Sequence, residues 1–230
     1  ASLRAQTLHE IEIIVVDDRS TDETPEILRR LAAADDRIRV FSATGSGIVD
    51  ALNQALAAAR SDIIARLDAD DVSEPDRLAR QLAELEARPG LVLLGSAATR
   101  IGSDGRVIGA IAVETDPERL AQQLRDGNPF LHPSVVMRRG AVEAAGGYRR
   151  PFALAEDYDL WIRLARLGEI ANLPDPLIRL RRHHNQSSRL HRHAQRAVHA
   201  LARLLAYGPS VATEAIVGLA SPREAVAAYI

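Results

Sequence analysis

The first part of the chain alternates short apolar runs with longer amphipathic segments. Residues 11–16 form a β-branched run between polar residues, which is typical of a strand buried on both faces of a parallel sheet. Polar residues at 20–23 then supply N-cap chemistry for a helix, because apolar side chains recur behind them at helical spacing. The pattern therefore predicts a strand, a loop and a helix in succession.

This unit repeats along the next stretch of sequence. We expect a short strand near 37–41, a glycine-bearing loop at 44–47, a helix at about 48–59, a strand at 63–67 and a helix at 75–87. Strands that alternate with helices imply a parallel sheet with right-handed crossovers, and ligands bind beyond the carboxyl ends of its strands. Those ends carry Asp17 and Asp18 after one strand, and Asp68, Asp70 and Asp71 after another.

After about residue 90 the pattern becomes less regular and mixes strands with helices. We expect strands at 91–94, 97–101, 107–113 and 135–138, with a hairpin turn at 103–105, and helices at 117–125 and 157–167. Residues 179–203 contain no acidic residue, and apolar positions recur within them at helical spacing. They predict an amphipathic helix whose basic face is either simply solvated or in contact with a diphosphate, a membrane surface or a partner.

The composition excludes several kinds of chemistry. All 29 basic residues are Arg, which removes phosphate binding by a P-loop lysine and every Schiff-base mechanism. The absence of Cys removes disulfides, thiolate nucleophiles and Cys-ligated zinc. A net charge of −2 offers no global footprint for nucleic acid, and no apolar run approaches the ~20 residues of a membrane span. Any anion must therefore be bound locally.

The strongest local signal is the run Asp68-Ala69-Asp70-Asp71. Carboxylates crowded at a strand end repel one another unless a cation or solvent screens them, and hard oxygen ligands select Mg²⁺ or Mn²⁺. An acidic N-cap for the helix that begins at Pro75 explains the same residues about as well. The second acidic strand end, at Asp17 and Asp18, favours the metal site.

Another class of protein also places acidic residues at strand ends. The run Val15-Val16-Asp17-Asp18, with a further Asp near 68, resembles the Mg²⁺-binding pocket of a phospho-accepting receiver domain. That pocket also requires a Lys, and this chain contains none. A nucleotidyltransferase of similar sheet architecture would need a Gly-rich phosphate loop, usually with a Lys, near the start, and neither is visible.

Motifs in order along the chain resemble the glycosyltransferases of family 2. They are Glu12 to Asp22 (EIIVVDDRSTD), Ala65 to Asp71 (ARLDADD), Asn128 to Ser134 (NPFLHPS), and Gly146-Gly147-Tyr148 followed by Ala155 to Arg163 (AEDYDLWIR). The resemblance implies a Rossmann-like GT-A fold of the α/β class, with a mostly parallel central sheet flanked by helices and a mixed acceptor-side half. It also implies a nucleotide-diphosphate sugar donor, UDP-linked in the first instance, and direct displacement with inversion.

The resemblance also implies domain boundaries. The family-like domain would span residues 1–188, with a nucleotide-sugar half at about 1–90 and an acceptor half at about 91–188. A C-terminal helical extension would then cover residues 189–230.

Residue roles follow from the same resemblance, position by position. Asp157 resembles the catalytic base, and Asp70 the principal ligand of Mn²⁺ or Mg²⁺, with His183 able to reach the metal or the diphosphate. Without the family pattern, Glu156 and Asp157 would be read as a helix N-cap and His183 as a solvated side chain. The residues expected to bind the donor nucleotide are Asp17, Asp18, Arg66 and Asp68, and those expected on the acceptor side are His132, Glu156 and Trp161.

The sequence departs from the family pattern in two places. The family opens with a strand that ends in a nucleotide-binding loop, and this chain starts in the helix after it. We therefore expect an open position beside a central strand, which exposes an edge prone to pairing with another chain. Thr44-Gly45-Ser46-Gly47 also replaces the usual Asn-x-Gly arrangement, which weakens any assignment of donor contacts to that loop.

The leading hypothesis is an inverting glycosyltransferase that binds a nucleotide-sugar donor and a glycan or glycolipid acceptor. The alternative is a non-catalytic or truncated glycosyltransferase-like binding protein, which the missing strand favours and the acidic motifs oppose. We expect no nucleic-acid partner and a cytoplasmic location, with contact at the inner face of the membrane and a homo-oligomer both left open.

Overall fold

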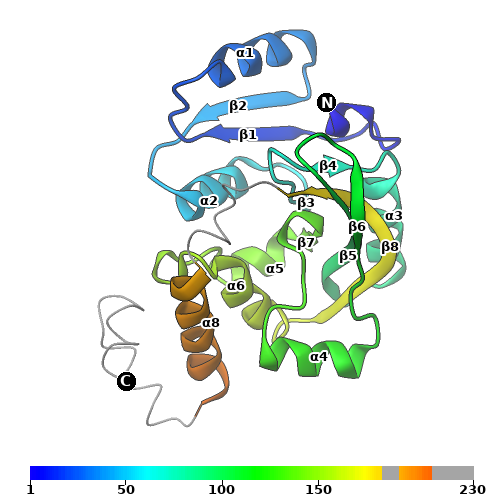
Figure 1. Ribbon diagram of the computed structural model, residues 1–230, viewed down its shortest axis with the longest axis vertical. Helices are drawn as coiled ribbons and strands as arrows, with labels where there is room; N and C mark the ends of the chain where they lie inside the picture. The colour runs from blue at the N-terminus through cyan, green and yellow to red at the C-terminus, as the bar shows by residue number, and fades with distance from the viewer. Residues whose placement is uncertain (183–191, 209–230) are drawn as a thin grey trace.

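The computed structural model describes residues 1–182 and 192–208 (Figure 1). Strands and helices alternate in the first half, as the hydrophobic pattern predicts. The elements there are η1 (Ser2–Ala5), β1 (Ile13–Asp17), α1 (Thr24–Ala34), β2 (Ile38–Ser42), α2 (Ile48–Ala58), β3 (Ile63–Ala65), β4 (Val72–Ser73) and α3 (Arg77–Ala87).

The second half mixes long strands with short helices. The elements are β5 (Leu91–Ile101), β6 (Val107–Ile111), α4 (Pro117–Asp126), η2 (His132–Ser134), β7 (Val136–Arg138), α5 (Arg139–Ala144), η3 (Arg150–Phe152), α6 (Glu156–Leu164), β8 (Glu169–Arg181) and α8 (Arg192–Tyr207). The two strands expected at 91–94 and 97–101 are one continuous strand, β5. The sequence pattern did not indicate β8, because Pro174 and Pro176 interrupt it and its register shifts against β5.

The α/β fold class is confirmed, but the sheet is mixed rather than mostly parallel. Six strands form one sheet in the order β3-β7-β5-β8-β4, with β6 paired to β5. Only the β5–β8 pair in this sheet is parallel, and the other pairs are antiparallel. Buried apolar runs indicate strands without fixing their direction, and β7 enters between β3 and β5 from the second half of the chain.

Strands β1 and β2 form a separate two-stranded parallel sheet beside α1 (Figure 1). Among the described strands, β1 pairs with β2 alone and β3 pairs with β7 alone. The expectation that β1 is buried on both faces is wrong for most of the strand, since only Ile13 is buried and residues 14–17 are partly exposed. An unpaired edge with half-buried apolar residues explains that exposure.

The main hydrophobic core lies between the six-stranded sheet and the helices α4, α6 and α8. Its largest buried side chains include Trp161 and Tyr158 of α6 and Met137 of β7. The amphipathic helix expected within 179–203 is present as α8, but residues 179–181 belong to the end of β8. Helix α8 packs beside α6 (Figure 1). Val198, Leu201 and Ala202 of α8 belong to this same core.

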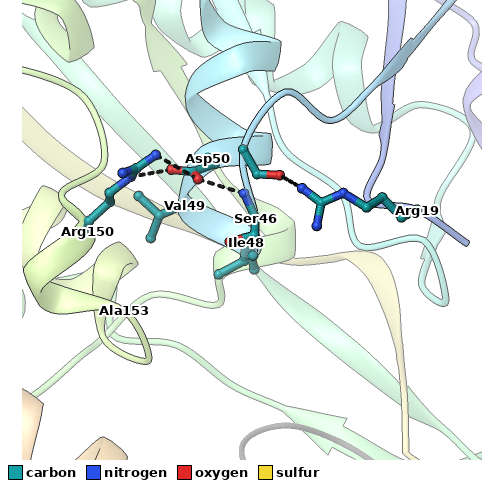
Figure 2. A pocket seen from close by; sticks show the side chains of 9 residues that line it. Arg19, Ser46, Ile48, Val49, Asp50, Arg150 and Ala153 are labelled. Atoms are coloured by element: carbon teal, nitrogen blue, oxygen red, sulfur yellow. Dashed lines mark hydrogen bonds and ion pairs between the residues drawn. The ribbon is translucent and has the colours of Figure 1, made fainter.

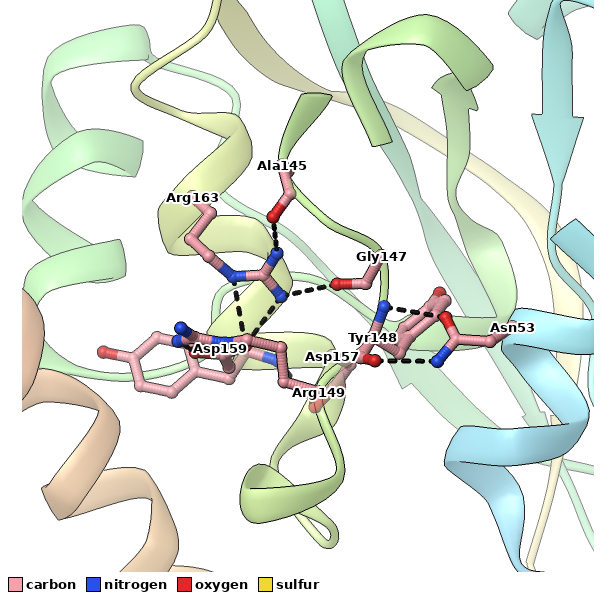
Figure 3. A network of polar contacts seen from close by, with 9 residues as sticks. Asn53, Ala145, Gly147, Tyr148, Arg149, Asp157, Asp159 and Arg163 are labelled. Carbon is pink, nitrogen blue, oxygen red and sulfur yellow. Dashed lines mark hydrogen bonds and ion pairs between the residues drawn. The ribbon is translucent and has the colours of Figure 1, made fainter. Parts of the chain in front are cut away.

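A buried carboxylate anchors the first turn of α6 to the preceding loop. Asp159 accepts hydrogen bonds from Arg149 and from Arg163, whose Nη2 lies 2.7 Å from Asp159 Oδ2. Arg163 also donates to the carbonyl oxygens of Ala145 and Gly147, as Figure 3 shows. We call Asp159, Arg149 and Arg163 the α6 clamp.

The turn held by the α6 clamp needs glycine. Gly146 and Gly147 have φ of 82° and 66°, a region that side chains with a Cβ rarely adopt. The backbone of Tyr148, next in sequence, exchanges two hydrogen bonds with the side chain of Asn53 on α2 (Figure 3). The clamp therefore connects α6, this loop and α2.

Replacing Leu201 by Ala should lower the free energy of unfolding of the whole domain by roughly 2–4 kcal/mol, because a core leucine leaves a cavity. Leu201 is 4% exposed, whereas Leu167, a matched control, is 49% exposed. Urea unfolding of both Leu→Ala variants provides the comparison. If the main transition is unchanged in Leu201→Ala, α8 is energetically separate from the domain.

Replacing Arg163 by Met should lower the free energy of unfolding by roughly 3 kcal/mol or more, because it leaves the charge of Asp159 buried with one guanidinium fewer. Arg29 pairs with Glu26 on the surface of α1 and serves as the control. Arg29→Met should change stability by less than about 0.5 kcal/mol. Equal losses of unfolding free energy in the two variants would show that the α6 clamp contributes no more to stability than a surface ion pair.

Candidate active site

Three carboxylates gather in the loop between β3 and β4. Each of Asp68, Asp70 and Asp71 offers an oxygen, and these oxygens lie within 4.8 Å of one another. Asp71 is buried, and its Oδ1 accepts a hydrogen bond of 2.7 Å from the backbone N–H of Arg181 at the end of β8. Burial, followed by the charges of the two neighbouring carboxylates, raises the pKa of Asp71 to about 6. The sequence-predicted cluster is therefore assembled in space.

These residues fit a divalent cation. All three ligands are hard oxygen atoms, which Mg²⁺ and Mn²⁺ prefer, and the cluster concentrates negative charge that a cation would neutralise. Asp70 is the most exposed of the three. The backbone carbonyl of Asp70 accepts a hydrogen bond of 2.9 Å from Nε of Arg181. His183 lies outside the described residues.

Arg66 lies beside this cluster, one residue after β3. Its side chain is buried and forms an ion pair with Asp68. Its Nη1 is buried and has no hydrogen-bond partner among residues 1–182 and 192–208. An unmet guanidinium N–H in a buried site costs about 1–3 kcal/mol, so this atom is suited to bind an oxygen of a ligand.

Arg77, which is fully buried, holds the backbone of Arg66 in place. Arg77 of α3 donates from Nη2 to the backbone carbonyl of Arg66 at 2.8 Å and from Nε to Gln81 at 2.9 Å. Burial, followed by the charge of Arg66, lowers the pKa of Arg77. The position of the β3 end is thus fixed by a buried polar network.

Asp157 stands in the first turn of α6. Its Oδ2 accepts a hydrogen bond of 2.7 Å from Nδ2 of Asn128, and its Oδ1 accepts one from the backbone N–H of Tyr158. Burial raises the pKa of Asp157, while these hydrogen bonds and the charges of His199 and Arg66 offset part of that effect. The carboxylate is oriented and has an increased affinity for a proton.

Glu156, the residue before Asp157, bonds to the loop that precedes α6. It is buried, and its Oε2 accepts a hydrogen bond of 2.7 Å from the backbone N–H of Leu154. Leu154 has a φ of 84°, a strained value for a residue with a side chain, so this bond closes a tight turn before α6. Burial, then the charge of Asp157, raises the pKa of Glu156.

The aromatic residues predicted on the acceptor side pack together. Nε2 of His132 lies 3.0 Å from the hydroxyl of Tyr148, and its ring meets Trp161 edge-on at 5.6 Å. Burial, then the charge of Arg66, lowers the pKa of His132 well below its usual range, so its ring is neutral at pH 7. Trp161 is fully buried and packs edge-on against Phe130, so it belongs to the core next to the site.

The charge of Arg66 affects acidic residues at both places. It partly offsets the rise in pKa that burial causes in Asp71 of the cluster and in Glu156 and Asp157 at the start of α6.

Asp17, the last residue of β1, and Asp18 form a second acidic group in the structure. Asp17 accepts hydrogen bonds from the backbone and side chain of Ser20, and Oδ2 of Asp18 accepts one of 2.8 Å from the backbone N–H of Gly47. Next to Asp18 is a cavity of about 610 Å³, shown in Figure 2. Its lining is Arg19, residues 45–50, Arg150 and Ala153. Residues 45–47, part of the glycine loop that departs from the family pattern, therefore line this cavity.

Three residues in this region were not singled out from the sequence. Asn128 stands at the start of a quoted motif, but its contact with Asp157 spans 29 positions and could not be inferred from spacing. The sequence does not indicate a role for Arg77, because an Arg on a helix is normally solvated. His199 lies in the basic helix, for which the sequence indicates only a surface role, yet its ring stacks on that of Tyr158, the residue after Asp157.

Residues 1–145 match glycosyl transferase family 2. The amylovoran biosynthesis glycosyltransferase AmsE of Erwinia amylovora is 33% identical over 183 residues, covering 78% of this chain and 68% of AmsE. The putative glycosyltransferase EpsE of Bacillus subtilis is 35% identical over 185 residues, covering 78% of this chain and 66% of EpsE. The chain thus spans about two thirds of the length of these relatives.

Solved structures share the fold. The mannosyltransferase PcManGT from Pyrobaculum calidifontis, in complex with GDP-Man and Mn²⁺, aligns with a TM-score of 0.64 at 22% identity, over 99% of this chain and 67% of that chain. TarS of S. aureus, in complex with UDP-GlcNAc, aligns with a TM-score of 0.65 at 19% identity, over 80% of this chain and 54% of that chain. From the family match and these relatives, the chain belongs to glycosyltransferase family 2, with the GT-A fold.

Proposed function

We propose that this protein transfers a sugar from a nucleotide-diphosphate donor, with UDP as the first candidate nucleotide, to a glycan or glycolipid acceptor with inversion. The observation that carries the proposal is the presence in one fold of an oxygen-ligand cluster after β3 and an oriented carboxylate, Asp157, at the start of α6. A cation site can hold a diphosphate, and an oriented carboxylate can take a proton from an attacking hydroxyl.

The donor would lie along the ends of β1 and β3. Asp18 accepts a hydrogen bond from Gly47, which lines the cavity, and Asp17 precedes it, so this end suits the nucleoside. Arg66 and Asp68 lie at the other end, and the unpaired Nη1 of Arg66 offers a hydrogen bond to a donor oxygen. Asp70 and its neighbours would hold Mn²⁺ or Mg²⁺, with His183 as a further ligand. The Mn²⁺ in the PcManGT complex supports this choice of ion.

In the proposed reaction, separate groups would stabilise the leaving diphosphate and accept the proton of the acceptor hydroxyl. A divalent cation, when bound, stabilises the negative charge that develops on the departing diphosphate. Asp157 takes the proton of the acceptor hydroxyl as that oxygen attacks the anomeric carbon. Asn128 and the N–H of Tyr158 hold the carboxylate in place, and no second carboxylic acid is needed to protonate the leaving group. The displacement is a single step and inverts the anomeric centre.

The acceptor side is less defined. Glu156, His132 and Trp161 lie around the start of α6, and among them Glu156 and Trp161 are buried. AmsE takes part in amylovoran biosynthesis, which favours a bacterial cell-envelope polysaccharide as the acceptor class. None of the helices in the described part of the chain combines the length and apolar character of a bilayer span. A cytoplasmic location, at the inner face of the membrane, stays a prediction.

We expect UDP to bind only weakly in excess chelator and roughly tenfold or more tightly with Mn²⁺, because the carboxylates of Asp68, Asp70 and Asp71 repel a diphosphate that no cation bridges. Isothermal titration calorimetry with and without Mn²⁺ measures the difference. GDP, titrated in parallel, shows whether the base is selected. Equally tight binding of either nucleotide in EDTA would remove the metal from the proposal.

Asp157→Asn should reduce sugar transfer by about 10²–10⁴-fold while nucleotide affinity changes little, because Asn keeps the size of Asp and an oxygen for the N–H of Tyr158 but cannot accept a proton at neutral pH. Asp70→Asn should weaken both transfer and Mn²⁺-dependent nucleotide binding. The donor for these assays comes from a panel of nucleotide sugars screened with Mn²⁺.

Asp126→Asn, at the exposed end of α4, is the control and should leave both measurements unchanged. A wild-type rate in Asp157→Asn would show that Asp157 is not the base. An inactive wild-type protein across the whole panel would contradict the proposed function itself.

A further inference from the structure

Helix α8 presents a regular stripe of exposed side chains to solvent. The stripe repeats every three or four residues along the helix, through His193, Arg196, Ala200, Arg203 and Tyr207. The opposite side of α8 is buried in the main core, through Val198, Leu201 and Ala202. The sequence of α8 contains no acidic residue, so the exposed stripe combines basic and neutral groups only.

Two arginines from neighbouring elements extend this stripe. The guanidinium carbon of Arg125, in the last turn of α4, lies 5.6 Å from the centre of the Tyr207 ring. Arg166, which follows α6, donates a 2.8 Å hydrogen bond from Nη2 to the carbonyl oxygen of Ala206. Both arginines are exposed, as is Leu167 beside them. We call this surface the α8 patch and define it by Arg125, Arg166, Arg196, Arg203 and Tyr207.

The positive charge of the α8 patch is not neutralised within the described residues. None of its arginines forms an ion pair inside 1–182 and 192–208, whereas surface arginines such as Arg29 and Arg139 do. Asp126, next to Arg125, bonds to Gln122 and adds one negative charge to this area. The chain as a whole has a net charge of −2, so the α8 patch is a local excess of positive charge.

The arrangement of these cations suits an extended anionic surface. Arg196 and Arg203 are two helical turns apart, about 10 Å along α8, so one small anion cannot reach both. Tyr207 is 42% exposed at the end of the stripe, and tyrosine rings favour the headgroup level of a bilayer. The apolar side of α8 is occupied by the core, so the helix cannot insert that side into lipid. Contact with a bilayer is therefore electrostatic.

We propose that the α8 patch binds the surface of an anionic lipid bilayer and holds the proposed transfer site beside it. Helix α8 packs against α6, whose first turn carries Asp157 (Figure 1). The ring of His199 on α8 stacks on Tyr158, the residue after Asp157, with centroids 4.9 Å apart. A glycolipid anchored in that bilayer would lie close to the acceptor side. This role rests on the proposed acceptor, whereas the binding itself needs neither donor nor acceptor.

Co-sedimentation of the full chain with lipid vesicles tests the proposal. Vesicles of phosphatidylcholine with about a third of phosphatidylglycerol should bind the protein at low ionic strength and release it at high salt, because screening weakens charge attraction. Vesicles of phosphatidylcholine alone should not bind it. Arg196→Gln/Arg203→Gln should lower the affinity for the anionic vesicles roughly tenfold or more, since each arginine near such a surface contributes about fivefold.

Arg60→Gln/Arg106→Gln is the matched control, because it removes the same charge from exposed positions on other elements. This variant should bind the anionic vesicles nearly as the wild type does. Thermal unfolding checks that Arg196→Gln/Arg203→Gln keeps its fold, and Arg125→Gln/Arg203→Gln takes its place if it does not. Glutamine is a good helix former and suits all of these positions on α4 and α8.

Equal binding by the patch and control variants would overturn the proposal, as would equal binding to neutral vesicles. Failure of the wild type to bind anionic vesicles would also overturn it, and would favour an acidic protein partner or a simply solvated surface. An inactive protein that binds anionic vesicles would contradict the proposed function alone. A protein that transfers sugar but does not bind those vesicles would contradict the role of the α8 patch alone.

Discussion

The arrangement of the site depends on the buried carboxylate of Asp159. A charge at this depth is tolerated only because Arg149 and Arg163 neutralise it, and Arg163 also holds the turn at Gly146 and Gly147. The same turn fixes the backbone of Tyr148. The clamp thus determines where α6 begins, and the residue that begins it is followed at once by Asp157. A catalytic carboxylate needs such rigid support, since small displacements cost much of the rate.

The second constraint is electrostatic. The loop after β3 concentrates three carboxylates, and the described part of the chain places the buried Arg66 beside them. Its charge partly offsets the rise in pKa that burial causes in Asp71 and in Asp157. A cation and a diphosphate would complete this balance, which gives a physical reason why the free protein keeps an unpaired Nη1 at this point.

Much of this could be predicted from the sequence, because local patterns carry local information. The acidic strand ends and the start of α6 lie close to where hydrophobic periodicity predicts them, although the N-cap of α6 is Ala155 rather than an acidic residue. The direction of the strands could not be predicted, and β8 was missed because two prolines interrupt it. Contacts between distant parts of the chain could not be predicted either. Asn128 bonds to Asp157, and His199 stacks on Tyr158, only through tertiary packing.

The central proposal is that one site holds a cation at the β3 loop within reach of the base on α6. The most direct measurement is the anomalous scattering of Mn²⁺ in crystals grown with MnCl₂ and UDP. We predict a single strong peak coordinated by Asp70, with the diphosphate of UDP bound between the ion and Asp157. A peak at another group of residues, or a nucleotide bound away from Asp70 and Asp157, would contradict the account.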